Sequence, residues 1–467
     1  MVYHRVILSD MPLAEELLLA ADYYEAVVIE TMKYIVERYN RKGDYGWIDT
    51  KFSMITGEDF SEDDFLKGTN TITGWIQGRG VEAVAEHAQW IKQNRTDLDS
   101  LELVDQLDTI IREVVDNLKL IRRKNFGHLY FFMTLDGEPF KLDSGGKPTS
   151  VKLDDNSPYN FSDAFCAKGM YSAALHLNDQ KLMDEMEKYC LDVDHAIWNG
   201  NFKSDQQTLD PKNQIRHIAD RHPQSPKMIH VSACTKLVKG KRNSQSVDMG
   251  LKTINHILNN HANINNKWPQ LQANDFVEYI DKDGSPYLEK SSVIYSDPGH
   301  ALELVGLIHE FTSACRKTQA ATAKQLKKIV NIESHLIGVL QQNFQNGFQP
   351  VPGGICKSYD LTGRKAIYDD MAWWPLPETM RAALGCLQIA KNKDQRNLCL
   401  EIYRKCHNSF VKNFVRPDRH LMAIQTLAKD GSVVDAIPAT PDTDPGYHTG
   451  LSLLSCIASI RYWQKIE

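Results

Sequence analysis

Two histidines in this chain follow nearly the same short motif, Asp297-Pro298-Gly299-His300 and Asp444-Pro445-Gly446-Tyr447-His448. In each motif we predict that the aspartate caps a long apolar helix and that the proline lies in its first turn. Unpaired backbone N–H groups and the positive end of the helix dipole would then lie beside each imidazole and favour its neutral form. Two neutral histidines in one pocket could form a proton-transfer pair. Because Asp-Pro-Gly also starts helices that carry no activity, the rest of the chain must support this interpretation.

The composition is that of an ordinary globular protein. The 467 residues are 42% hydrophobic and 24% charged, with a formal net charge of −6, so we expect neither nucleic acid nor an anionic membrane as a partner. The first 25 residues do not resemble a signal peptide, and no apolar run reaches the length of a membrane span. The nine cysteines form no C-x-x-C pair, which favours reduced thiols and a cytoplasmic location.

Apolar periodicity and helix stop signals predict about twelve helices. They cover residues 13–40, 73–93, 98–122, 161–177, 179–198, 226–238, 246–260, 298–315, 321–343, 371–391, 393–413 and 447–463. A long segment of about 25 to 40 residues follows every odd-numbered helix, whereas only a few residues follow each even-numbered one. Short connections join antiparallel neighbours, so all of the long segments must lie at one end of the molecule.

The predicted helices also alternate in character. Helix 98–122 is amphipathic, whereas helices 298–315, 371–391 and 447–463 are apolar nearly all round. Amphipathic helices belong on the outside of a fold and uniformly apolar helices on the inside. We therefore predict an all-α protein in which residues 1–467 form one (α/α)6-barrel domain, a toroid of six outer and six inner helices.

The long segments contain strand signals of their own. Residues 127–137 and 276–284 are predicted as strands with hairpin turns at the dipeptides Asp136-Gly137 and Asp283-Gly284. We expect short β-hairpins at one mouth of the barrel.

Polar and aromatic residues gather where the inner helices are expected to start. They are Trp75, Gln77, Arg79, His230, His300, Glu303, Trp373, Trp374, Glu378 and His448. Burying an arginine, two glutamates and three histidines at the starts of apolar helices is costly unless a pocket uses them. The set therefore predicts a functional pocket at the loop-rich mouth.

Four segments of this set resemble the ordered signatures of the N-acylglucosamine 2-epimerase family. They are Trp75-Ile-Gln-Gly-Arg79, Asp297-Pro-Gly-His-Ala-Leu-Glu303, Trp373-Trp-Pro-Leu-Pro-Glu378 and Tyr447-His448. The family includes N-acetylglucosamine, cellobiose and mannose 2-epimerases and related aldose–ketose isomerases on an (α/α)6 barrel. The resemblance runs from about residue 45 to the end of the chain.

The resemblance implies a role for each matching residue. His300 and His448 match the two acid/base histidines, and Arg79 matches the arginine near the reacting end of the sugar. Glu303 matches a glutamate that bonds an imidazole or a hydroxyl group. We also expect six further residues to bind the substrate: Trp75, Gln77, His230, Trp373, Trp374 and Glu378.

Two departures from the family pattern leave the sugar open. N-acylglucosamine epimerases resemble Trp-Trp-Pro-His-Ser-Glu where this chain has Leu376 and Pro377. Cellobiose epimerases tend to carry a further histidine and glutamate where Met228 and Ala233 stand. The sequence therefore predicts the chemistry but not whether the C2 substituent is a hydroxyl or an N-acyl group.

The expected chemistry starts with removal of the C2 proton of an open-chain aldose. Arg79 would supply positive charge to the resulting enediolate. Return of a proton to the opposite face of C2 gives the epimer, and its return to C1 gives a ketose. This chemistry needs no metal and no cofactor. The partners expected are a small sugar and, by resemblance, a second copy of the chain in a homodimer.

Two other classes of function stay open at this stage. A glycoside hydrolase or polysaccharide lyase could use the same barrel, with Asp369 and Asp370 beside Glu303 or Glu378 as the carboxylates. A non-catalytic module could bind sugar or protein at the concave face, although the histidine pair would then have no evident role.

Overall fold

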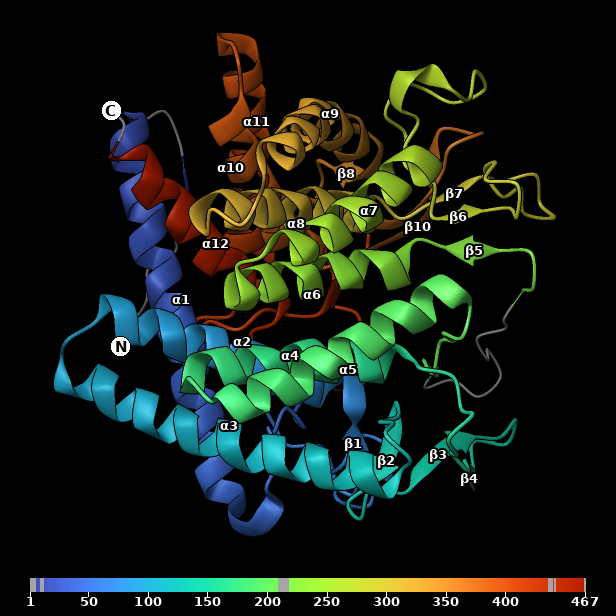
Figure 1. Cartoon of the computed structure of the whole chain (residues 1–467). Helices are drawn as coiled ribbons and strands as arrows, with labels where there is room; N and C mark the ends of the chain where they lie inside the picture. The colour runs from blue at the N-terminus through green and yellow to red at the C-terminus, as the bar shows by residue number, and fades with distance from the viewer. Residues whose placement is uncertain (1–5, 9–11, 209–217, 436–439, 441, 466–467) are drawn as a thin grey trace.

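Twelve α-helices alternate between an outer and an inner ring (Figure 1). The computed structural model describes residues 6–8, 12–208, 218–435, 440 and 442–465, and this count refers to them. The outer helices are α1 (Leu13–Lys42), α3 (Leu98–Lys124), α5 (Gln180–Asn199), α7 (Ser244–His261), α9 (Ala323–Gly347) and α11 (Lys393–Ser409). The inner helices are α2 (Gly74–Asn94), α4 (Phe161–Leu177), α6 (Ser225–Lys241), α8 (Pro298–Lys317), α10 (Pro375–Ile389) and α12 (His448–Trp463).

The inner helices form a closed ring. Each packs against the next in the order α2, α4, α6, α8, α10 and α12, and α12 packs against α2 again. The helix α4 is buried along nearly its whole length, whereas α3 buries only its apolar face, which includes Leu107, Ile111, Val114 and Leu118. This is the predicted difference between inner and outer helices, and the (α/α)6 barrel is confirmed.

The tightest crossing in the ring joins α2 to α4 through two glycines. A Cβ on Gly78 would lie 2.7 Å from the backbone nitrogen of Cys166, and a Cβ on Gly169 would collide with the carbonyl oxygen of Gly78. The two backbones therefore touch, which fixes the direction of α2 and hence the place of Arg79.

The strands are short and gather at one end of the barrel, on the right in Figure 1. One sheet has the order β1 (Thr71–Thr73), β2 (Phe132–Thr134), β3 (Pro139–Leu142) and β4 (Pro148–Ser150). A second has the order β11 (Thr426–Leu427), β10 (Lys365–Ala372), β9 (Gly354–Asp360) and β7 (Tyr295–Ser296), with β8 (Phe348–Gln349) also paired to β9. The pair β5 (His222–Pro223) and β6 (Tyr279–Ile280) is antiparallel.

Two predicted helix boundaries were wrong near these strands. The helix expected to start at 371 starts at Pro375, because Met371 and Ala372 pair with Leu427 and Thr426 in the second sheet. The helix expected to reach 413 ends at Ser409, and a π-helical turn over Phe410–Phe414 follows it. The expected hairpins are present but contain fewer strand residues than the sequence patterns suggested.

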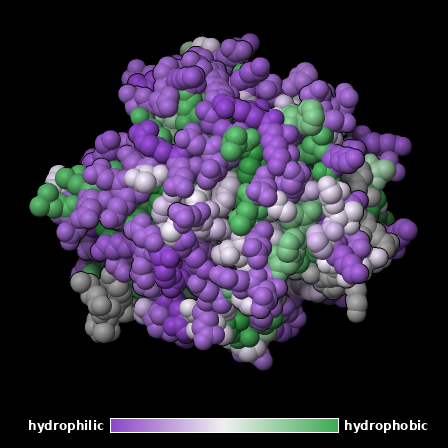
Figure 2. Space-filling model, turned by 90° about the horizontal axis from the view of Figure 1, so that it is seen from below, coloured by the Kyte–Doolittle hydropathy of each residue, from purple (hydrophilic) through white to green (hydrophobic). Residues whose placement is uncertain are grey.

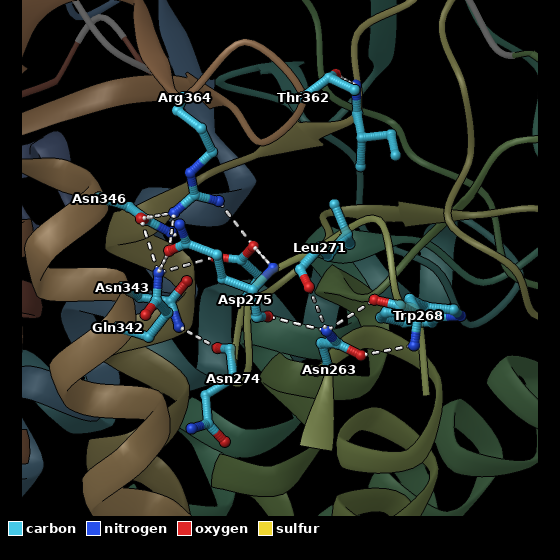
Figure 3. Close-up of polar contacts among 12 residues, drawn as sticks. Asn263, Trp268, Leu271, Asn274, Asp275, Gln342, Asn343, Asn346, Thr362 and Arg364 are labelled. Carbon is cyan, nitrogen blue, oxygen red and sulfur yellow. Dashed lines mark hydrogen bonds and ion pairs between the residues drawn. The ribbon is translucent and has the colours of Figure 1, made fainter. Parts of the chain in front are cut away.

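A polar network fixes the long segment that follows α7 (Figure 3). Arg364, in the turn between β9 and β10, bonds Asp275 Oδ2 at 2.7 Å and the side chain of Asn346 on α9 at 2.6 Å. Asn346 Nδ2 donates to the other carboxylate oxygen of Asp275 at 3.0 Å. Three elements are thereby joined at Asp275, three residues before Glu278, whose side chain enters the site described below.

One face of the molecule is mainly polar. On the face that Figure 2 shows, hydrophilic residues dominate and apolar residues form scattered groups. Among the described helices, none is both long enough and apolar enough to cross a lipid bilayer.

Candidate active site

A cavity of about 310 Å³ lies at the strand-bearing end of the barrel. Because the inner helices start at this end, the cavity lies among their N-termini. Seven of the residues predicted from the sequence line it: Trp75, Arg79, His300, Glu303, Trp373, Trp374 and His448. Its size is near the lower end for small-molecule sites, which suits a monosaccharide.

Three predicted site residues are placed elsewhere. Gln77 is 1% exposed, and its side-chain amide pairs with the backbone N–H and C=O of Ile48, each at 3.0 Å. His230 points away from the cavity, and its Nε2 lies 2.7 Å from Asp194 on α5. On α6 it is Ser225, Met228 and Ile229 that face the cavity, so the predicted helical phase was wrong at this point.

Glu378, the third of these, lies directly behind the cavity wall. It is in the first turn of α10, is 2% exposed, and accepts a hydrogen bond from His448 Nδ1 at 3.0 Å. It therefore meets the imidazole and not the space for the substrate.

His300 lies in the first turn of α8. Its backbone N–H donates to the capping carboxylate of Asp297 at 3.3 Å, and Pro298 is the first helical residue, as predicted. Its ring Nδ1 lies 3.1 Å from Glu278 Oε2 and 3.4 Å from Asp297 Oδ2. Lys357 on β9 bonds the same Asp297 oxygen at 2.6 Å.

His300 is a proton donor at neutral pH. Burial by itself would lower the pKa of the imidazole, but the carboxylates of Asp297 and Glu278 outweigh burial and raise that pKa to about 9. The prediction of a neutral imidazole was therefore wrong for His300, because two carboxylates that contact the ring have a larger effect than the helix terminus.

His448 is the first residue of α12. The Asp444 carboxylate accepts from the backbone N–H groups of Tyr447, His448 and Thr449 at 2.8, 3.3 and 3.1 Å. The chain reaches the helix through Gly446, whose φ of +89° favours glycine. The predicted place of Pro445 in the first turn was wrong, because the helix starts only after Tyr447.

His448 is neutral at pH 7, as expected. Burial and the positive charge of Arg79 lower the pKa of its imidazole to about 4, although Glu303 and Asp444 oppose them. Burial raises the pKa of Glu378 to about 7, and its other oxygen is bonded to Arg381, so Glu378 adds little negative charge beside His448. The Nδ1 of His448 is held by Glu378, which leaves Nε2 as the nitrogen that can accept a proton.

Trp374 lies against both imidazoles. Its ring centroid is 5.5 Å from that of His300 and 5.3 Å from that of His448, with interplanar angles of 33° and 35°. A Cβ on Gly299 would lie 2.8 Å from the Trp374 ring, so glycine allows α8 to approach it. The two imidazoles therefore lie in the same cavity, and both contact the ring of Trp374.

Arg79 supplies a positive charge, and no described carboxylate forms an ion pair with it. Its guanidinium lies 4.2 Å from the ring centroid of Phe165, 5.2 Å from that of Tyr447 and 5.3 Å from that of Trp75. The Nε atom is buried and has no hydrogen-bond partner in the described part of the chain. Burial lowers the pKa of Arg79 despite the nearby carboxylates, so this cation is poorly compensated and suited to a developing oxyanion.

The other two tryptophans are fixed by their indole N–H groups. Trp75 donates to Asp205 at 3.1 Å, and Trp373 donates to Thr449 Oγ1 at 3.1 Å. Both rings keep an edge or face on the cavity. Leu376, at the first departure from the family pattern, is fully buried in the core and is absent from the described lining.

Three of these groups are close enough together to be tested as metal ligands. Glu303, Glu378 and His448 offer ligand atoms that all lie within 4.8 Å of one another. Arg381 is already bonded to Glu378, and the charge of Arg79 acts on His448, so two cations oppose a divalent ion here. We therefore regard the three as proton-transfer groups. The absence of a metal and of a cofactor stays a prediction.

The sequence did not reveal Glu278 and Lys357. Glu278 is an acid within the apolar segment Phe276–Ile280, and its burial at 3% exposure is the unusual feature that could have indicated a role. Lys357 lies on β9 beside Ser358 and near Asp360, and its side chain is 38% exposed, so the sequence offered no such signal for it. Neither is near His300 in sequence, so helix-based reasoning could not place them beside it.

The chain resembles known proteins both in its sequence profile and in its fold. The sequence profile of the N-acylglucosamine 2-epimerase family matches residues 147–449. No curated protein sequence matches. Among solved structures, a D-mannose isomerase is similar over 94% of this chain and 98% of its own, with a TM-score of 0.62 and 13% identity.

Two epimerases have the same fold. A sugar epimerase from a ruminal bacterium covers 93% of this chain and 98% of its own, with a TM-score of 0.60 and 11% identity. The cellobiose 2-epimerase from Bacillus thermoamylovorans B4167 covers 84% and 88%, with a TM-score of 0.57 and 12% identity. The family profile matches more than half of the chain, which therefore belongs to the N-acylglucosamine 2-epimerase family.

Proposed function

We propose that this protein is a carbohydrate isomerase that epimerises a monosaccharide, or the reducing-end sugar of a larger one, at C2. The observation that carries the proposal is the pair of imidazoles on one cavity, one neutral and one protonated, with the poorly compensated cation of Arg79 in the same lining. Membership of the family supports the same reaction class.

The first step uses His448 as the base. Its free Nε2 takes the C2 proton of the open-chain aldose, and the electron pair of the C–H bond delocalises onto the carbonyl oxygen as an enediolate. The guanidinium of Arg79 stabilises that oxyanion. Glu378 stabilises the imidazolium through Nδ1, where the hydrogen bond already exists.

The second step uses His300 as the acid. The protonated imidazole delivers its proton to the opposite face of C2, and the carbonyl forms again as the enediolate collapses. Glu278 and Asp297 hold His300 in the charged form that this step needs. The product is the C2 epimer, and the two histidines have exchanged their protonation states.

Ketose formation is a second candidate reaction, and the same protonation states favour it. A single neutral base could move the proton from C2 to C1 while a protonated imidazole moves a proton between the two oxygens. An aldose–ketose isomerase would need only His448 at carbon and His300 at oxygen.

The hydrolase and lyase hypothesis has less support. Asp369 is paired with Lys429 and Asp370 is exposed, and neither is among the described residues that line the cavity. The five carboxylates that do line it include Asp442, which is bound to Lys51 and two threonines, and Asp444, which caps α12.

Exchange of the C2 proton in D2O tests the proposal. Candidate aldoses, with free and with N-acylated C2 substituents, are incubated with the protein and followed by proton NMR. Loss of the C2–H signal with appearance of a C2 epimer is expected, and deuterium at C1 of a ketose would favour the second candidate. Release of a new reducing end without exchange would contradict both.

The location and assembly of the protein are part of this proposal. All nine cysteines are buried free thiols, which suits a reducing compartment such as the cytoplasm. A homodimer remains a prediction from the resemblance alone.

A further inference from the structure

A second and larger cavity, of about 630 Å³, lies at the other end of the barrel. It is lined by later turns of five inner helices, α2, α6, α8, α10 and α12. Lys239 and Tyr462, whose side chains are about half exposed, lie at its edge, so the cavity opens to solvent. The sugar chemistry proposed above makes no use of it.

Only a thin layer of side chains separates the two cavities. Glu303 and Tyr447 line both of them, and Glu378 lines the second. Tyr447 is fixed, because its hydroxyl accepts a hydrogen bond from buried Lys168 at 2.7 Å. Glu303 differs from its neighbours, since it is 7% exposed and its carboxylate receives no hydrogen bond from any described residue.

Glu303 lies within reach of the proposed base. Ligand atoms of Glu303, Glu378 and His448 all lie within 4.8 Å of one another. Burial raises the pKa of Glu303, with Glu378 adding to the effect, whereas the pKa of His448 is lowered to about 4. A proton on the His448 imidazolium therefore moves readily to the Glu303 carboxylate.

The proposed epimerisation needs a step that removes the proton from His448, and this inference rests on that proposed function. Each turnover leaves His448 protonated and His300 deprotonated, so one proton must leave and one must enter before the next. The His300 side chain is 25% exposed at the substrate mouth and can regain a proton there. The His448 side chain is 11% exposed and lines the cavity in which the sugar is proposed to bind.

We propose that Glu303 is a proton relay that connects His448 with the water of the second cavity, so that substrate and proton use opposite ends of the barrel. The N–H bond of the imidazolium breaks as an O–H bond forms on Glu303, and that O–H bond then breaks to water. Glu303 returns to a carboxylate, His448 to the neutral base, and no electrons are exchanged.

The isosteric change Glu303→Gln tests the relay by separating the first turnover from later ones. The substrate is the aldose that wild type exchanges in D2O, mixed with enzyme and quenched on the millisecond scale. The first turnover needs no reset, so its rate is expected to fall by less than about tenfold, through the lower pKa that His448 has without the charge of Glu303. Steady-state turnover is expected to fall roughly 10²-fold, within the range for a positioned acid or base. The result is a burst of one product per active site.

Two further variants locate the path. Glu303→Ala leaves room for formate, and added formate is expected to restore the steady-state rate without changing the burst. Glu303→Gln leaves no room for formate and is the matched control. Ser455→Phe narrows the second cavity without touching the first and is expected to slow only the steady state.

Several outcomes would overturn the relay. A first turnover that slows as much as the steady state, with a raised KM, would mean that Glu303 binds the sugar instead. A normal steady state in Ser455→Phe, with its fold verified by circular dichroism, would mean that the proton leaves elsewhere. If wild type exchanges no sugar at all, the proposed function itself fails, which is a different result from any of these.

Discussion

The starts of α8 and α12 have similar residues, yet they present imidazoles of different charge. At α8, His300 contacts Glu278 and Asp297, and Lys357 compensates only one of these two carboxylates. At α12, the described carboxylate that bonds the His448 ring is Glu378, which is also bonded to Arg381, and Arg79 adds a further positive charge. The protonation state therefore depends on residues that other elements bring to each ring.

The magnitudes explain why the shared motif does not decide the charge. A charge at a helix terminus is typically worth about 0.3–1 kcal/mol. A carboxylate in contact shifts a pKa by about 1–3 units, or roughly 1.4–4 kcal/mol. Two such contacts at His300 outweigh both its helix terminus and its burial. At His448, the carboxylate of Glu378 is paired with Arg381 and does not outweigh burial, so the imidazole is neutral.

The largest expected effect is removal of either imidazole. His448→Asn and His300→Asn should each lower kcat/KM by roughly 10²- to 10⁴-fold while the barrel keeps its fold. The measurement is initial rate with the sugar identified by C2 exchange, with circular dichroism as the check on folding. Near-normal rates in both variants would end the two-histidine assignment.

The charge difference itself should be visible in the pH dependence of wild type. The base must be deprotonated, so kcat/KM falls below a pH of about 4, and the acid must be protonated, so it falls above about 9. Two pH units beyond either limit, the rate should be about a hundredfold lower. A pH profile with a single limb near pH 6.5 would mean that the two imidazoles do not differ in pKa.

The carboxylates around His300 offer a sharper test. Glu278→Gln removes one negative charge but keeps the shape and a hydrogen-bonding atom, so the pKa of His300 should fall by about 1–3 units. The alkaline limb then moves down from about 9, so activity at pH 8 should fall by about two- to hundredfold, whereas at least about half of it should be kept at pH 6. Glu289→Gln is the matched control, because Glu289 pairs with Arg221 and is not in the described lining of the cavity.

At His448, removal of a neighbouring charge should raise the pKa of the imidazole instead of lowering it. Arg381→Met removes the cation that compensates Glu378, so the pKa of His448 should rise and the acid limb should move up from about 4. The variant also leaves a buried carboxylate unpaired, which costs roughly 3–5 kcal/mol of stability. The double variant Arg381→Met with Glu378→Gln removes both charges and should recover part of that stability, which thermal unfolding would measure.

The sequence predicted the barrel well, because helix character and loop length alternate along the chain and both can be read from local stretches of sequence. It also predicted Asp297 as the cap of α8. It could not predict the charge of His300, since Glu278 comes from the segment before β7 and Lys357 from β9. It wrongly placed Pro445 in the first turn of α12, because the left-handed Gly446 and the extra Tyr447 put the first helical residue three positions beyond Pro445.

The sequence also failed to predict which residues of a helix face the cavity, as α2 shows. Arg79 and Gln77 are two residues apart in one predicted signature, but a helix turns about 100° per residue, so they point in different directions. Arg79 lines the cavity, whereas Gln77 joins α2 to the backbone of Ile48. The same argument separates Met228 and Ile229, which face the cavity, from His230, which faces α5.

The smallest kinetic effect is therefore expected at Gln77. Gln77→Leu leaves the N–H and C=O of Ile48 buried without partners, which should cost about 1–3 kcal/mol of unfolding free energy. Because the side chain does not reach the cavity, kcat and KM should stay within about twofold of wild type. Trp75→Leu, two residues earlier on a face that does line the cavity, should raise KM instead. A Gln77 variant with normal stability and a raised KM would place its amide on the sugar and would reverse the helical phase inferred for α2.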